Sequence, residues 1–182
     1  MRTIFFTREG DSGKSGFGAK KIKKDDELFD ALGALDAVNS LMGWCATSSK
    51  KTPQLHRDIF AVQEMIFIAQ AELAAIGFGM KSAQMIDAKT IKRLEAMILD
   101  IDAKLPPLKK FVLPGGSELA ARLDIARVAA RDAERALVRF NAKKKCSPDL
   151  LTFANRLSSV LFAFARFANF KLHVKEKNPS YR

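Results

Sequence analysis

The sequence predicts an all-α protein built as a bundle of five antiparallel helices. In five separate segments, apolar residues recur at alternating steps of three and four. Residues typical of helix starts and stops bound most of these segments, and the connections between them are short. There is no strong strand pattern and no internal repeat. A chain of 182 residues is long enough for one domain with a substantial core.

The first two helices are expected over residues 25–47 and from about 53 onward. Thr52 is the predicted N-cap of the second helix, with Pro53 at its first position. Gly77 is the predicted stop. The apolar stripe of this helix is Leu55, Ile59, Val62, Ile66, Ala69, Leu73 and Ile76.

The third helix is expected over residues 87–104 and ends before Pro106 and Pro107. Ser117 is a good N-cap for the fourth helix, and Ser147 followed by Pro148 starts the fifth. Short connections between such helices favour an antiparallel bundle of the up-down, ferritin-like type. Many apolar residues lie outside the single stripes, which indicates further burial in an oligomer.

The expected organisation has three parts. Residues 1–24 form a glycine- and lysine-rich loop, residues 25–170 form the bundle, and residues 171–182 form a polar tail that is expected to be mobile. Lys and Arg outnumber Asp and Glu by 31 to 20, a formal net charge of +11. That excess favours an anionic partner but does not separate ATP from nucleic acid or acidic lipid.

The cysteine and apolar content indicates a cytoplasmic protein without a zinc site. Cys45 and Cys146 are not in a CxxC arrangement, so a zinc site or disulfide framework is not expected. No apolar run of membrane-spanning length is expected. The first motif begins at Thr7, which leaves no room for a signal peptide.

A row of arginines is the first candidate binding feature. Residues 127, 131, 135 and 139 are all Arg, and a four-residue step stacks them along one face of the fourth helix. Glu134 lies in the same stripe. A guanidinium is always charged and its planar fork suits carboxylate or phosphate oxygens. The alternative is a solvated basic face with local ion pairs.

The second candidate feature is the loop TREGDSGKSGFG, which begins at Thr7. Its glycines let backbone N–H groups turn inward and approach an anion. Five lysines follow within reach, at positions 14, 20, 21, 23 and 24. The GxxxxGK[ST] spacing of a Walker A loop is absent, and a flexible basic N-terminus is the alternative.

Five ordered motifs resemble the PduO-type ATP:corrinoid adenosyltransferases, over roughly residues 5–170. They are TREGDSGKS with Lys24-Asp25-Asp26, GALDAVNS from Gly33, LPPLKKFVLPGG, Arg131-Asp132-Ala133-Glu134-Arg135, and NRLSS from Asn155. The resemblance implies a homotrimer with active sites between subunits. It also implies transfer of the 5′-deoxyadenosyl group of ATP to the cobalt of cob(I)alamin, with Mg²⁺ and a reductase that supplies the electron.

The resemblance also implies roles for individual residues. The catalytic residues are Arg131, Glu134 and Phe111, and the corrinoid contacts are Asp36, Phe111 and Arg127. Asp36 and Arg127 would pair across the subunit boundary, and Phe111 would keep the lower ligand away from cobalt. Mg²⁺ would be held mainly through ATP, with Glu134 as the protein candidate. The ATP-binding residues are Thr7, Arg8, Gly10, Asp11, Gly13, Ser15, Gly16, Lys24, Arg131, Glu134, Arg135 and Asn155.

Several positions depart from the family pattern. Glu9, Asp132 and Ser159 stand where the family has Thr, Arg and Asp, and Ala37 and Asp124 stand where Glu and His are usual. The chain is therefore either an adenosyltransferase or a divergent, non-catalytic ATP- or corrinoid-binding protein of the same fold. A helical nucleic-acid binder is a third interpretation, suggested only by the charge.

Overall fold

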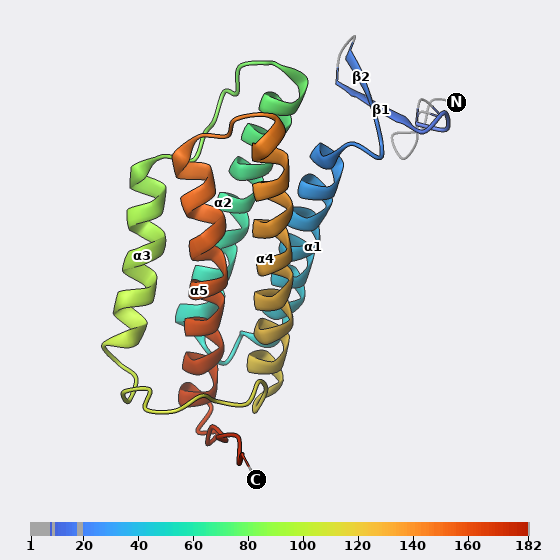
Figure 1. Cartoon of the computed structure of the whole chain (residues 1–182). Helices are drawn as coiled ribbons and strands as arrows, with labels where there is room; N and C mark the ends of the chain where they lie inside the picture. The colour runs from blue at the N-terminus through green and yellow to red at the C-terminus, as the bar shows by residue number, and fades with distance from the viewer. Residues whose placement is uncertain (1–7, 9, 18–19, 182) are drawn as a thin grey trace.

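The chain folds into five long helices preceded by a small hairpin (Figure 1). The structure is a computed structural model that describes residues 8, 10–17 and 20–181. The strands are β1 (Lys14–Phe17) and β2 (Lys20–Lys23). The helices are α1 (Glu27–Ser48), α2 (Pro53–Phe78), α3 (Ala88–Asp102), α4 (Glu118–Lys143) and α5 (Pro148–Lys171).

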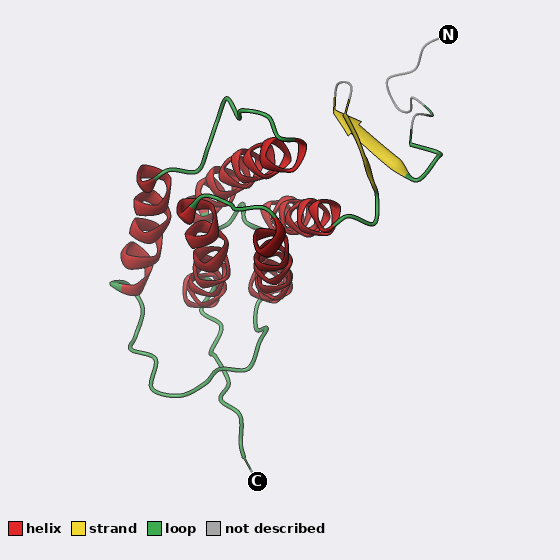
Figure 2. Cartoon of the chain, turned by 45° about the horizontal axis from the view of Figure 1, so that its top comes forward, coloured by secondary structure: helices red, strands yellow, loops and turns green. Residues whose placement is uncertain are grey.

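The helices lie side by side, with α1 between α2 and α4, and α5 between α4 and α3 (Figure 2). At one end of the bundle, Lys143 Nζ of α4 lies 2.9 Å from Glu27 Oε1 of α1. At the other end, Asn169 near the end of α5 accepts a hydrogen bond from Ser117 N, just before α4. The starts of α1 and α5 thus lie near the end of α4, so α4 runs antiparallel to both of its neighbours. The predicted all-α bundle of five helices is confirmed.

The helix starts follow the sequence signals closely. Ser117 Oγ accepts from Ala120 N, and Ser147 Oγ accepts from Leu150 N. Thr52 stands at the N-cap of α2, but its side chain makes no capping bond and instead donates to Ser49 O. Thr52 is thus the N-cap residue as predicted, but the predicted stop at Gly77 is wrong. A Cβ there would collide with Leu28, and α2 continues to the left-handed Gly79, with φ of 70°.

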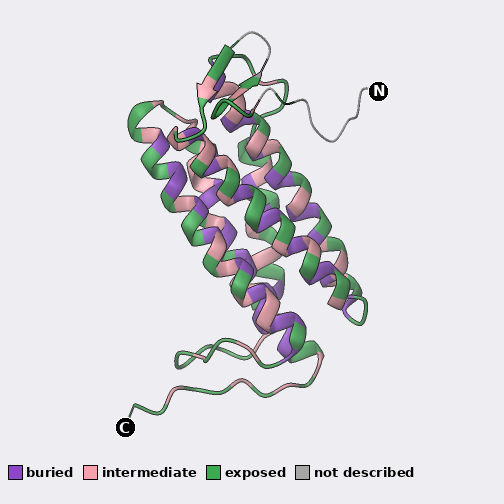
Figure 3. Cartoon of the chain, turned by 90° about the vertical axis from the view of Figure 1, so that its right-hand side faces the viewer, coloured by how far each residue is buried: buried purple, intermediate pink, exposed green. Residues whose placement is uncertain are grey.

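Apolar side chains fill the space between the helices, and buried and exposed residues alternate along each ribbon (Figure 3). Helix α5 contributes the largest share, because Phe153, Phe164 and Phe167 are all nearly inaccessible. Phe60 and Phe67 of α2, by contrast, remain 49% and 64% exposed. The second apolar face expected on α2 is therefore uncovered in the single chain.

Helix α2 also corrects an expectation about membranes. It is long and apolar enough to cross a membrane by length and composition alone, although no such run was expected. In this fold it packs along α1 and buries Leu55, Ile59 and Ile66 in the core. A core helix of a bundle passes the same test, and burial explains part of this composition, because 44% of the apolar window is buried.

A buried carboxylate ties two connections together at the hairpin end of the bundle. Glu72 of α2 is fully buried, and its Oε2 accepts from Ile86 N at 2.8 Å. Its Oε1 accepts from Ser147 Oγ at 2.6 Å. The α2–α3 and α4–α5 connections are therefore joined through one side chain.

Strands β1 and β2 were not expected from the sequence. They pair antiparallel, with Ser15 opposite Ile22 and Gly16 opposite Lys21. Their residues lack the apolar alternation of a half-buried strand, because β2 reads KKIK and its lysines are exposed. The pairing depends on backbone hydrogen bonds, and Lys20 Nζ anchors the hairpin to Phe78 O of α2 at 2.8 Å. Part of the predicted N-terminal loop is thus a hairpin.

Candidate functional site

The arginine row on α4 contains both paired and unpaired members. Arg127 Nε lies 3.2 Å from Asp124 Oδ1, in a half-buried pair. The contact between Arg135 and Asp132 is 3.6 Å and largely exposed, so it adds little stability. Arg131 is exposed and has no ion-pair partner among the residues that the structure describes. It is therefore free to bind an anion without first breaking an internal contact.

A hollow of about 360 Å³ lies over this part of α4. Its lining residues are Arg131, Glu134, Arg135, Val138 and Arg139. Three arginine side chains and one carboxylate therefore line the same hollow. This combination suits a polyanionic ligand with a bound metal cation, because the arginines can bind the anion and the carboxylate the cation.

Polar contacts from α5 hold the carboxylate at this hollow. Asn155 Nδ2 donates to Glu134 Oε1 at 2.7 Å, and Arg156 Nη1 donates to Asn155 Oδ1 at 2.7 Å. Arg156 in turn pairs with Glu95 of α3 at 2.9 Å. The predicted residues Arg131, Glu134, Arg135 and Asn155 are therefore close together, and Arg156 orients one of them.

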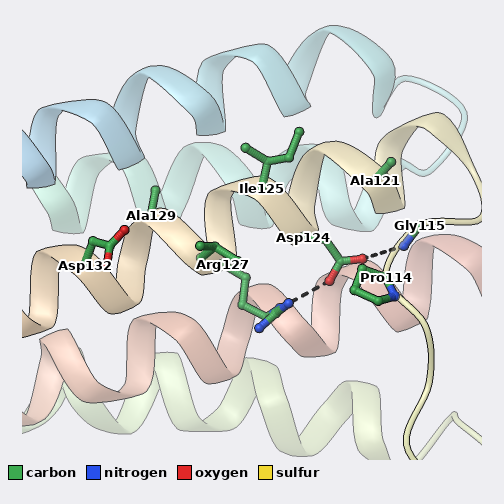
Figure 4. A pocket seen from close by; sticks show the side chains of 9 residues that line it. Pro114, Gly115, Ala121, Asp124, Ile125, Arg127, Ala129 and Asp132 are labelled. Carbon is green, nitrogen blue, oxygen red and sulfur yellow. Dashed lines mark hydrogen bonds and ion pairs between the residues drawn. The ribbon is translucent and has the colours of Figure 1, made fainter. Parts of the chain in front are cut away.

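A second, larger hollow lies further toward the start of α4 (Figure 4). Its volume is about 570 Å³, and Pro114, Gly115, Ile125, Val128 and Arg127 are among its lining residues. Asp124 accepts from Gly115 N at 2.8 Å and also pairs with Arg127. One carboxylate therefore joins the loop before α4 to the arginine on that helix.

Phe111 lies on the loop that leads into this hollow. Its side chain is 79% exposed, which excludes the core-packing role that its residue type alone would favour. An exposed aromatic ring on this loop is suited to contact a large flat ligand.

Asp36 is exposed on α1 and has no ion-pair partner within the described part of the chain. Its predicted partner Arg127 pairs with Asp124 inside the same chain. The expected pair between Asp36 and Arg127 spans two subunits, so it stays a prediction.

The glycine-rich loop forms a tight turn over residues 10–13, within the part of the chain that the structure describes. Gly13 is in the left-handed region at φ of 72°, and its carbonyl accepts from Lys24 N at 2.9 Å. Lys24 Nζ would lie 3.0 Å from a Cβ at Gly10, so the ammonium group reaches over the loop. Asp11, Ser15 and Gly16 follow the same turn and strand; Thr7 and Glu9 lie outside the described residues.

The loop and the arginine row are not neighbours in one chain. The hairpin extends beyond the end of the bundle near the start of α1 (Figure 1), whereas Arg131 is in the middle of α4. The hairpin and the middle of the arginine row are therefore separated along the bundle in one chain.

Comparisons with known proteins agree with these motifs. The profile described as cobalamin adenosyltransferase matches residues 5–168. The chain belongs to the cobalamin adenosyltransferase family. A family member from Citrobacter freundii, named corrinoid adenosyltransferase, is 36% identical over 163 residues, which are 88% of this chain and 92% of that relative.

Two further members of the cobalamin adenosyltransferase family extend the comparison. The corrinoid adenosyltransferase PduO of C. freundii is 35% identical over 92% of this chain, which spans only 50% of that relative's length. A variant PduO-type ATP:corrinoid adenosyltransferase from Lactobacillus reuteri, solved in complex with cobalamin and ATP, has a TM-score of 0.88 at 30% identity. That match covers 96% of this chain and 98% of the solved one.

Sequence reasoning missed two residues that organise this adenosyltransferase site. In the sequence, Asp124 stands out only as a departure from the family pattern, and Arg156 only as part of NRLSS. The three-residue step from Asp124 to Arg127 predicts a pair on one helical face, so that contact could have been found. The bond between Arg156 and Glu95 joins α5 to α3, and no local pattern reports it.

Proposed function

We propose that this chain transfers the 5′-deoxyadenosyl group of ATP to the cobalt of a reduced corrinoid. The cobalt(I) electron pair attacks the 5′ carbon, a Co–C bond forms, and the C–O bond to triphosphate breaks with its electrons on the leaving group. No protein nucleophile is required. The tasks left to the protein are to orient ATP, stabilise the departing charge and exclude water.

The observation that carries the proposal is the hollow over α4, with unpaired Arg131 beside Glu134 and Asn155. Arg131 and Arg135 bind phosphate or ribose oxygens in this proposal, and Asn155 contacts the nucleotide. The loop of Gly10, Gly13 and Ser15, with Lys24, binds the triphosphate from a second subunit. The remaining loop contacts are Thr7, Arg8, Asp11 and Gly16.

Mg²⁺ is held mainly by the triphosphate in this proposal. The described residues contain no group of three or more His, Cys, Asp or Glu that could hold a metal ion. Glu134 uses Oε1 to accept from Asn155, so its second oxygen fits a Mg²⁺ ion carried by ATP. This residue set suits a nucleotide-borne cation rather than a resident metal centre.

The corrinoid would occupy the larger hollow beside Phe111 and Arg127. Phe111 packs against the lower face and displaces the lower ligand of cobalt, which eases reduction to cobalt(I). Asp36 of the adjacent subunit pairs with Arg127 at the boundary. The assembly is a homotrimer of ferritin-like, up-down bundles in the cytoplasm, and a separate reductase supplies the electron. Separation of the loop from the arginine row in one chain supports a site shared between subunits.

The proposal is tested anaerobically with chemically reduced cobalamin and Mg-ATP. The expected products are triphosphate and a light-sensitive Co–C corrinoid in equal amounts. ATP binding without either product would establish the non-catalytic alternative.

The phosphate role is tested with Arg131→Ala, which is expected to lower kcat/KM by about 100-fold, the usual effect of removing a charge-stabilising donor. The bundle should stay folded because the side chain is exposed. Arg93→Ala is the matched control, since Arg93 is an exposed arginine on α3 that lines neither hollow. Equal activity of the two variants would remove Arg131 from the site.

A further inference from the structure

The segment after α5 runs alongside the loop that carries Phe111 (Figure 3). Leu113 N donates to Lys177 O at 2.7 Å, and Asn178 Nδ2 donates to Phe111 O at 2.8 Å. These two bonds hold the loop backbone at Phe111 and two residues beyond it. The tail that was expected to be mobile is therefore pinned to the loop in this structure.

One buried guanidinium anchors both segments. The side chain of Arg166 is only 8% exposed, and its Nη2 lies 3.2 Å from Glu176 Oε2. Its Nε also faces the Glu176 carboxylate, at 3.2 and 3.3 Å from the two oxygens. The same Nη2 lies 3.3 Å from Pro106 O, at the start of the loop. A paired charge with so little water around it is held more firmly than an exposed pair.

The ring of Phe111 has little packing of its own, because the side chain is 79% exposed. The loop backbone therefore sets where the ring is attached, and the tail holds that backbone at Phe111 O and Leu113 N. The tail lies beyond residue 168, where the match to the family profile ends.

We infer that Glu176 and Asn178 are positioning residues that fix the Phe111 ring for contact with the corrinoid. This inference rests on the proposed function. Glu176 holds the tail through Arg166, and Asn178 carries that constraint to the Phe111 carbonyl. Loss of either contact lets the loop move, so the ring no longer keeps the lower ligand off cobalt. ATP binding is unaffected because its proposed residues lie on α4, at Asn155 of α5 and on the N-terminal loop, and those on the helices do not contact the tail within the described part of the chain.

The first test compares Asn178→Ala with Lys175→Ala, an exposed residue of the same segment that serves as the control. Asn178→Ala is expected to lower kcat with the corrinoid by about fivefold, the usual effect of one lost hydrogen bond. KM for ATP should stay within about twofold because the phosphate contacts remain. The absorption spectrum of bound cobalt(II) corrinoid should show more of the form that retains its lower ligand.

A second test separates positioning from a structural role. In a Phe111→Ala background, Asn178→Ala should cause no further loss, because the ring that it positions is gone. Glu176→Gln should act in the same direction as Asn178→Ala. Hydrogen exchange at the Leu113 amide, measured without any ligand, should be faster in both tail variants than in Lys175→Ala.

The outcomes distinguish this inference from the function on which it rests. An inactive unmodified chain overturns the proposed function and the inference with it. An active chain whose tail variants keep kcat and the cobalt(II) spectrum overturns the inference alone. Full additivity of Asn178→Ala with Phe111→Ala also overturns it, because the tail would then act without the ring.

Discussion

Replacement of Gly116 by alanine should destabilise the fold more than any other glycine-to-alanine change on the loop before α4. Gly116 has φ of 108°, a conformation that L side chains rarely adopt. An added Cβ would lie 2.6 Å from Oδ1 and 2.7 Å from Nδ2 of Asn169. Asn169 is 4% exposed, so it cannot simply turn into solvent.

The cost follows from two contributions. Backbone strain at positive φ costs about 1–2 kcal/mol for a residue with a Cβ. Displacement of Asn169 also breaks its bonds with Ser117 N and Gly115 O, both 2.8 Å. Each bond contributes about 1 kcal/mol. The sum is about 3–4 kcal/mol, which corresponds to a fall of about 10 °C in Tm for a chain of this size.

The assay is thermal unfolding followed by circular dichroism, at one protein concentration because Tm of the proposed trimer would depend on it. Gly43→Ala is the matched control. Its Cβ would meet only Gln63 Nε2, at an ordinary 3.5 Å. Alanine also has a higher helix propensity than glycine in a helix interior such as that of α1. Gly43→Ala should leave Tm unchanged or raise it. A Tm for Gly116→Ala within about 2 °C of the unmodified chain would refute the argument from strain and from Asn169.

Three further predictions address other buried or paired groups. Glu72→Gln should lower the urea midpoint of unfolding, because Gln leaves one buried donor without an acceptor, at a cost of about 1–3 kcal/mol. Glu64→Gln, an exposed change on the same helix, should leave the midpoint unchanged. Burial raises the pKa of the Cys45 thiol to about 12 and of the Cys146 thiol to about 11. Alkylation at pH 8 should therefore be slow, and slowest at Cys45. The thiols of the unfolded chain ionise at lower pH than the buried thiols of the folded chain. The free energy of unfolding should therefore fall as pH rises above about 9. Asp124→Asn should release its arginine partner and lower KM for the corrinoid by about twofold to fivefold without changing KM for ATP; unchanged corrinoid KM would contradict the role of that pair.

Helical periodicity and caps predicted the bundle well because both are local. Helices α4 and α5 begin directly after Ser117 and Ser147, as predicted, and their apolar stripes are buried in the core. The end of α2 was misplaced because Gly77 is needed for close packing on Leu28, which is a tertiary contact. The hairpin was missed because its lysine-rich strands pair through the backbone without an apolar face.

The candidate site was predicted unevenly for a related reason. The row from Arg127 to Arg139 follows from a four-residue step, and its proximity to Asn155 then depends on packing of α4 against α5. Contacts between distant segments left no sequence signal. The clearest example is the tail, whose polar composition suggested mobility although Glu176 is paired with a buried arginine.

Two of the departures from the family pattern gain a physical meaning from these contacts. Asp124 and Asp132 each supply an acidic partner, to Arg127 and Arg135 respectively. The first pair is half-buried and also holds Gly115, whereas the second is exposed and easily exchanged for a phosphate. Arg131 has no such partner in the described chain, so no internal contact opposes its binding to an anion. The acidic substitutions therefore leave the arginines proposed to bind phosphate largely available and restrict mainly Arg127, at the hollow proposed for the corrinoid.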